Sequence, residues 1–183
     1  LFDRYADELL VFGAREIFDL AQAYQMPERV ARKLIYTGYL TCRTAPRRIG
    51  EKARPTNRRR PMILLALEGG TESFGLIDTY LQSLERRGSG LPIRSLIVAG
   101  PGLPSHQKRE LAWRAQRLGN VYFHRHGEPL LHYARRADLI ICEAKYEVMC
   151  EILPHCKMAM VMPNANQRSK HSFRARLLQA HGL

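Results

Sequence analysis

Charged side chains in "ICEAKYEVMCEIL" (Ile141–Leu153) have the types and spacing of a possible phosphate site. The stretch follows a short apolar run and opens a predicted helix, and a helix that begins just after a strand often holds a phosphate. Glu143 and Glu147 bring negative charge there, and two like charges 5 Å apart repel by roughly 3 kcal/mol at an effective dielectric of 20. Lys145 would offset part of this repulsion. The pattern leaves three interpretations: a nucleotide site, the remains of one, or ordinary packing.

Glu151 is a candidate for binding the hydroxyl groups of a ribose. In the predicted helix, the apolar positions Met149, Cys150 and Leu153 face the sheet, so Glu151 could point back toward a cleft. A carboxylate accepts hydrogen bonds from both hydroxyls of a diol. The alternative is an ordinary acid on the solvent side of a helix, which is favoured when this residue is taken alone.

Two glycine-containing turns follow predicted strands. Gly69 and Gly70 would let the backbone approach a phosphate closely, and Thr71 and Ser73 add hydroxyl donors or helix caps. Gly100 ends the next strand and could form a ligand wall. An ordinary tight turn explains each of these features about as well.

The histidines and cysteines show no metal-binding pattern. His124, His126 and His132 surround the end of one predicted strand, where they could line a cleft or simply pack. The chain has no HExxH or CxxC motif and no defensible Ser-His-Asp or Cys-His arrangement. Reduced thiols, no bound metal and, weakly, an intracellular location are therefore expected. The cysteines are Cys42, Cys142, Cys150 and Cys156.

The chain is strongly basic. Its 183 residues carry a formal net charge of +12, with a pI near 10.0. Residues 43–61 hold eight Lys or Arg against one acid and are interpreted as a solvated linker or, less favoured, an anion site. An acidic protein or a membrane surface would suit this charge. A nucleic acid has only the charge in its favour, since no aromatic side chain interrupts the basic run for base stacking.

Apolar runs alternate with helical patterns after residue 60, which predicts an α/β fold with a Rossmann-like, doubly wound parallel sheet. Ligands of such sheets bind beyond the carboxyl ends of the strands. The predicted strands are 61–67, 91–100, 120–124, 138–142 and 157–163. The predicted helices lie near 76–84, 107–118, 128–137, 146–153 and 169–180.

The segment before the linker predicts a small additional piece. A strand is expected at 8–13, a helix at 16–24, and a second helix that starts at Pro27 and is broken by Gly38. This piece is too small to bury a core alone, so it is expected to dock on another part of a protein.

Several motifs, in order along nearly the whole chain, resemble predicted glycosyltransferases related to the enzyme that makes lipid II in peptidoglycan synthesis (the family 28 C-terminal domain type). The resemblance implies the C-terminal, donor-binding half of a GT-B fold. Residues 1–42 would end an acceptor-side domain, 43–60 would be the basic linker, and 61–183 the nucleotide-sugar domain without its last elements. The motifs are "DELLVFGAREIFDLAQAY", "VARKLIYTGYL", "SLIVAGPGLP", "ADLIIC", "CEIL", "MVMP" and "RARLLQAHGL".

The resemblance also implies a binding site for the donor. The donor would be a nucleotide-diphosphate sugar, expected to be UDP-linked, and no further cofactor or metal is expected. The chain departs from the family at its Gly-Gly pair, replaced by Ala144 and Lys145, and at its Asn-Thr pair, replaced by Glu147 and Val148. The nucleotide-sugar-binding candidates are Gly69, Gly70, Thr71, Gly100, Arg125, His126, Lys145, Glu151 and His171, the last replacing a glutamine.

Two functions follow. The first is a divergent hexosyltransferase, cytoplasmic or peripheral at a membrane face, whose catalytic base lies outside this chain. The second is a non-catalytic scaffold or assembly subunit that keeps the fold and uses its basic surface for a partner. The loss of the glycine pair and the added acids favour the second, while the retained order of motifs favours the first.

Overall fold

The computed structural model describes residues 2–40, 60–67, 71–88, 91–125, 130–152, 155, 158–162, 170–180 and 182. The chain divides into two compact units, residues 1–43 with 176–183, and residues 44–175. The sequence grouped residues 61–183 together, whereas the contacts group 176–183 with the first residues of the chain. The basic linker lies almost wholly outside the described residues.

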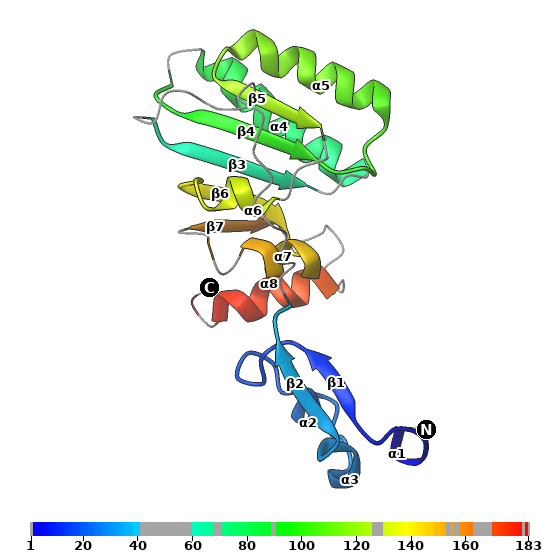
Figure 1. Ribbon diagram of the computed structural model, residues 1–183. Coiled ribbons are helices and arrows are strands. Elements are labelled where there is room, and N and C mark those ends of the chain that lie inside the picture. Colours follow the sequence, from blue (N-terminus) through cyan, green and yellow to red (C-terminus); the bar gives the residue numbers. More distant parts are fainter. Residues whose placement is uncertain are drawn as a thin grey trace. The chain divides into compact units, whose positions relative to one another are not determined.

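The larger unit contains a five-stranded parallel sheet in the order β5-β4-β3-β6-β7, flanked by helices (Figure 1). This arrangement confirms the predicted α/β, Rossmann-like fold. The strands are β3 (Met62–Leu67), β4 (Arg94–Ala99), β5 (Val121–Arg125), β6 (Leu139–Glu143) and β7 (Ala159–Met162).

Apolar side chains on both faces of the central strands form the core. In β3, consecutive residues Leu64 to Leu67 are all at most 2% exposed, and Leu96 to Ala99 of β4 are likewise buried. A strand buried on both faces needs helices on both sides of the sheet, which is why these runs do not alternate with polar residues. The uninterrupted register from Met62↔Arg94 to Leu67↔Ala99 keeps both strands in step.

The helices of the larger unit lie near the predicted positions, although the first of them begins earlier than predicted, at Thr71 and within the segment interpreted as a loop. They are α4 (Thr71–Arg87), α5 (Ser105–Leu118), α6 (Leu131–Ala134), α7 (Tyr146–Ile152) and α8 (Lys170–Ala180), whose last residues fall in the smaller unit. Gly119 ends α5 in the left-handed conformation (φ 70°), which glycine adopts without the steric cost of a side chain. Strands β4 and β5 are added one after the other on one side of β3. The chain then returns past β3, and β6 and β7 are added on its other side.

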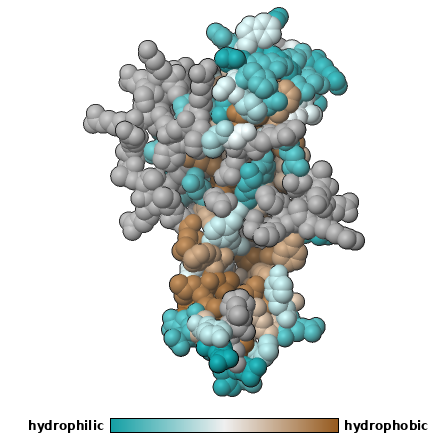
Figure 2. All heavy atoms as spheres, turned by 90° about the vertical axis from the view of Figure 1, so that its right-hand side faces the viewer, coloured by the Kyte–Doolittle hydropathy of each residue, from teal (hydrophilic) through white to brown (hydrophobic). Residues whose placement is uncertain are grey.

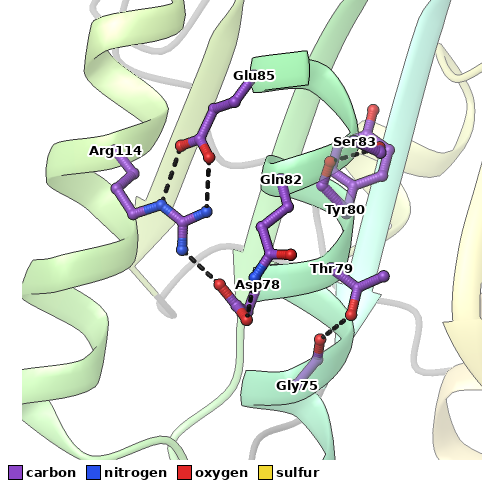
Figure 3. Close-up of polar contacts among 8 residues, drawn as sticks. All are labelled: Gly75, Asp78, Thr79, Tyr80, Gln82, Ser83, Glu85 and Arg114. Carbon is purple, nitrogen blue, oxygen red and sulfur yellow. Dashed lines mark hydrogen bonds and ion pairs between the residues drawn. The ribbon is translucent and has the colours of Figure 1, made fainter. Parts of the chain in front are cut away.

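Arg114 joins α4 to α5 (Figure 3). Its guanidinium donates to both carboxylate oxygens of Glu85, at 3.0 and 2.9 Å, and to Asp78 at 2.5 Å. These bonds lower the pKa of the Asp78 and Glu85 carboxyl groups and raise the pKa of Arg114. The two helices on this side of the sheet are thereby held by charge as well as by their apolar faces.

The smaller unit is built on a two-stranded parallel sheet, β1 (Leu9–Phe12) with β2 (Leu34–Gly38). The short helices α1 (Phe2–Tyr5), α2 (Leu20–Ala23) and α3 (Glu28–Ala31) complete its described part. The strand predicted at 8–13 is confirmed by β1.

Both helices predicted for this segment were too long. The second ends at Ala31, and Leu34–Gly38 is a strand because Ile35 and Thr37 are β-branched and alternate in exposure with their neighbours. The first begins only at Leu20, because the carboxylate of Asp19 accepts hydrogen bonds from the amides of Ala21 and Gln22 and so caps the helix there.

One face of the β1–β2 pair is apolar and exposed. Leu10, Phe12 and Ile35 are 60%, 55% and 41% exposed, and apolar side chains are visible at the height of this pair in Figure 2. Parallel sheets are normally covered on both faces, and isolated two-stranded sheets are only marginally stable. We therefore still predict that this unit docks on a further element, which would cover the exposed apolar face of the β1–β2 pair.

Candidate functional site

The direction in which successive strands are added to the sheet reverses between β3 and β6. Strands β4 and β5 extend the sheet on one side of β3, and β6 and β7 extend it on the other. Because the strands are parallel, the carboxyl ends of β3 and β6 lie next to each other. In open α/β sheets, ligands bind in the crevice at such a reversal point. The topology therefore makes the β3/β6 edge the candidate site.

Ser73, Glu143 and Lys145 meet at this edge. The Ser73 hydroxyl, from the first turns of α4, donates to Glu143 Oε1 at 2.5 Å. The Lys145 ammonium lies 2.9 Å from Glu143 Oε2. Ser73 is 1% exposed and Glu143 9% exposed, so the carboxylate at the end of β6 is buried between a hydroxyl and a cation.

The strands position this contact through their own hydrogen bonds. β3 pairs with β6 from Ile63↔Leu139 to Ala66↔Cys142, which brings Glu143 to the level at which β3 ends. At the start of the same pair, the Met62 amide donates to Asp138 Oδ2 at 2.9 Å. Asp138 therefore binds β3 at the start of the β3–β6 ladder, whereas Glu143, at its other end, binds Ser73 of α4.

Gly100 lies where the sequence placed it, at the end of β4. Its amide donates to the Leu67 carbonyl at 2.7 Å, and the residue is buried. Gly100 ties the ends of β3 and β4 together beside the candidate site.

Ala144 and Glu151 both lie on the segment that follows β6. Ala144 is 0% exposed, so a packed methyl group stands where the resembled family has glycine. Glu151 is half-buried in α7, and its neighbours Met149 and Cys150 are buried. This burial matches the expected orientation of the apolar side of the helix, and the ribose-binding role of Glu151 stays a prediction.

For the remaining predicted site residues, the structure describes at most the backbone position. Gly69, Gly70 and His126 lie outside the described residues. Thr71 begins α4, Arg125 ends β5, and His171 is in the first turn of α8, as backbone positions alone. Thr71 and Arg125 thus follow or end strands at the carboxyl edge of the sheet.

The histidine and cysteine predictions have mixed outcomes. The His124 ring lies 5.5 Å from the Tyr133 ring, which favours the packing interpretation of His124. Cys142 and Cys150 are buried and are not part of a disulfide. Within the described ranges, no group of three or more His, Cys, Asp or Glu side chains could hold a metal ion. No helix in the described part of the chain is both long and apolar enough to cross a membrane.

The contact of Glu143 with Ser73 was not predicted from the sequence. The sequence predicted that the charge of Glu143 repels a bound anion, with Lys145 as a partial offset, and this repulsion stays a prediction. Ser73 and Glu143 are 70 positions apart, so local spacing carries no sign of the contact. The available signal was a carboxylate that directly follows an apolar strand and precedes a lysine by two positions.

Comparison with known proteins adds no family assignment. No protein-family model matches the chain, and no curated protein is significantly similar to it in sequence.

Proposed function

We propose that the larger unit is a nucleotide-sugar-binding domain, the donor-binding half of a divergent glycosyltransferase that moves a hexosyl group to an acceptor. The observation that carries the proposal is the reversal of strand order between β3 and β6, with hydroxyl, carboxylate and ammonium groups gathered at the carboxyl ends of these strands. The resemblance in sequence motifs supports the same assignment.

The chemistry of such a domain is positioning and charge stabilisation. The diphosphate is the leaving group of the transfer, and donors held in place in a crevice stabilise the charge that develops on it. Ser73 and Lys145 offer a hydroxyl and an ammonium beside β3 and β6. Glu151 would accept the two ribose hydroxyls. The resemblance assigns the base that activates the acceptor to the acceptor-side domain, and no residue of this chain is nominated for that role.

A second function, a non-catalytic scaffold or assembly subunit, is favoured by one specific observation. The Glu143 carboxylate already takes the Ser73 hydroxyl and the Lys145 ammonium, and the Ala144 methyl is fully buried. A domain with these features could keep its fold without binding a nucleotide. Its positive charge would then serve an acidic protein or a membrane surface.

Replacing Glu151 with alanine is expected to weaken the affinity for UDP-sugars by at least about tenfold, because hydrogen bonds to a charged acceptor contribute roughly 1.5–3 kcal/mol. Isothermal titration calorimetry with UDP and UDP-sugars at moderate salt measures this. The melting temperature should stay nearly unchanged, since Glu151 is only half-buried.

Glu110→Ala is the matched control, because it removes an exposed acid from α5 on another part of the unit. It should leave the affinity unchanged. Binding by the unaltered protein that Glu151→Ala does not affect would refute the ribose role. No binding to millimolar ligand would refute the transferase proposal and favour the scaffold.

A further inference from the structure

We propose that Glu143 is an internal anion that occupies the phosphate position at the carboxyl ends of β3 and β6, so that a ligand phosphate binds only after this carboxylate has been displaced. The inference rests on the proposed function, since it concerns the same candidate site. It adds an autoinhibitory contact that is built into the fold.

The first argument is that the hydrogen-bond donors at this site, Ser73 and Lys145, already bind Glu143. A carboxylate and a phosphate oxygen accept hydrogen bonds from the same groups, hydroxyl and ammonium. Ser73 donates to one oxygen of Glu143, and Lys145 lies 2.9 Å from the other. Both groups that would hold a phosphate beside β3 and β6 therefore already hold an anion.

The second argument is burial. Ser73 and Glu143 are 1% and 9% exposed, so water competes little for their hydrogen bond. Lys145 is less enclosed, with 27% of its side chain exposed. An incoming phosphate would thus reach Lys145 first and would have to move the Glu143 carboxylate to reach Ser73.

The third argument is local charge. Lys145 and Glu143 together carry no net charge, so the pair offers little attraction to an anion. Without the carboxylate charge, the ammonium would present a full positive charge beside the hydroxyl. Removing a like charge near an anion site is expected to strengthen anion binding by about tenfold or more, even where solvent weakens the interaction.

The test uses the full chain and the variant Glu143→Gln, titrated by calorimetry with UDP, pyrophosphate and uridine. Glutamine keeps the shape and an oxygen acceptor but removes the charge. The affinities for UDP and pyrophosphate should rise about tenfold, and the affinity for uridine, which has no phosphate, should not change. Glu72→Gln is the matched control, because it removes an exposed acid from the first turn of the same helix α4.

Glu143→Asp guards against failure of the glutamine variant to fold. Aspartate keeps the charge but is too short to reach both Ser73 and Lys145, so a smaller gain of about threefold is expected. Circular dichroism melts establish that each variant is folded.

The outcomes separate this inference from the proposed function. An equal rise in the affinities for UDP and pyrophosphate supports the internal anion. If, in addition, uridine does not bind and UDP is not preferred over pyrophosphate, the result refutes a nucleotide-sugar site. No gain for either phosphate ligand in the folded Glu143 variants overturns the internal anion, whether or not the unaltered protein binds UDP. An equal gain in Glu72→Gln also overturns it, since the effect would then be one of overall charge.

Discussion

Replacing Leu81 with alanine is expected to lower the free energy of unfolding of the larger unit by about 3 kcal/mol. Leu81 lies in α4, is 0% exposed and belongs to the core cluster that also contains Leu65 of β3, Ile97 of β4 and Leu111 of α5. The truncation removes buried apolar surface and leaves a cavity that the rigid sheet cannot fill. Chemical unfolding followed by circular dichroism measures the loss.

Ser83→Ala provides the control for this truncation. Ser83 is two positions further along α4, and its exposed hydroxyl donates only to the Tyr80 carbonyl of the same helix. Its replacement should change the free energy of unfolding by less than about 0.5 kcal/mol. A loss under about 1 kcal/mol for Leu81→Ala would mean that α4 is not packed on the sheet as described.

Replacing Arg114 with methionine is expected to cost about 2 kcal/mol at neutral pH, because it leaves Asp78 and Glu85 facing each other without their common cation. A fully buried pair would cost roughly 3–5 kcal/mol when broken. The lower value is expected since the Asp78 and Glu85 side chains are 28% and 40% exposed. Arg117→Met is the control, as Arg117 is exposed and lies over the Trp113 ring on the same helix.

The cost of the Arg114 substitution should depend on pH in one direction. Arg114 lowers the pKa of Asp78 and of Glu85 below their ordinary values of 3.8 and 4.5. The folded state therefore holds these protons less tightly than the unfolded state, and the stabilisation is complete above about pH 4.5 and lost as the pH falls through the lowered pKa values. The free energies of unfolding of the unaltered protein and of Arg114→Met should converge as the pH falls below the two lowered pKa values. A constant difference across this range would contradict the ion-pair explanation.

The larger sheet could be predicted from the sequence because its strands are buried on both faces. Runs such as "MILLAL" and "LIVA" are apolar throughout, and each is followed by a helical pattern. Such runs have few alternatives to a parallel sheet. The predicted helices of this unit likewise overlap α4 to α8, although α4 begins earlier than predicted.

The smaller unit was harder to predict because its elements are short. "LIYTG" follows a helical turn without a clear break, and a helix of this length has little of its own stability. Pairing with β1, which is distant in sequence, decides that this segment is a strand. Local patterns contain no information about that partner.

The contacts of the candidate site were not predicted in detail. The loops after β3, β4 and β6 were expected to hold it; Ser73 lies in the first turns of α4, Gly100 follows β4, and Lys145 follows β6. The position of the Glu143 carboxylate between Ser73 and Lys145 depends on the pairing of β3 with β6, which closes a long stretch of chain. Sequence spacing alone therefore identified the charge of Glu143 but not its hydrogen-bond partners.

The central place of β3 sets an order in which the larger unit can assemble. Strand β4 follows β3 closely, whereas Asp138, which binds the Met62 amide at the start of β6, is 76 positions away. Local contacts form faster than distant ones. During refolding, pulse-labelled hydrogen exchange should protect the amides of β4 before those of β6, and simultaneous protection would contradict this order.

On the ribosome, the same arrangement leaves one edge of β3 open for a time. At roughly 5–20 residues per second, the 76 residues between Met62 and Asp138 take about 4–15 s to synthesise. Throughout that interval the nascent chain presents an apolar strand with unpaired backbone groups, a feature that promotes aggregation. Slow translation of this segment would prolong the exposure, so the yield of folded protein depends on how quickly β6 arrives.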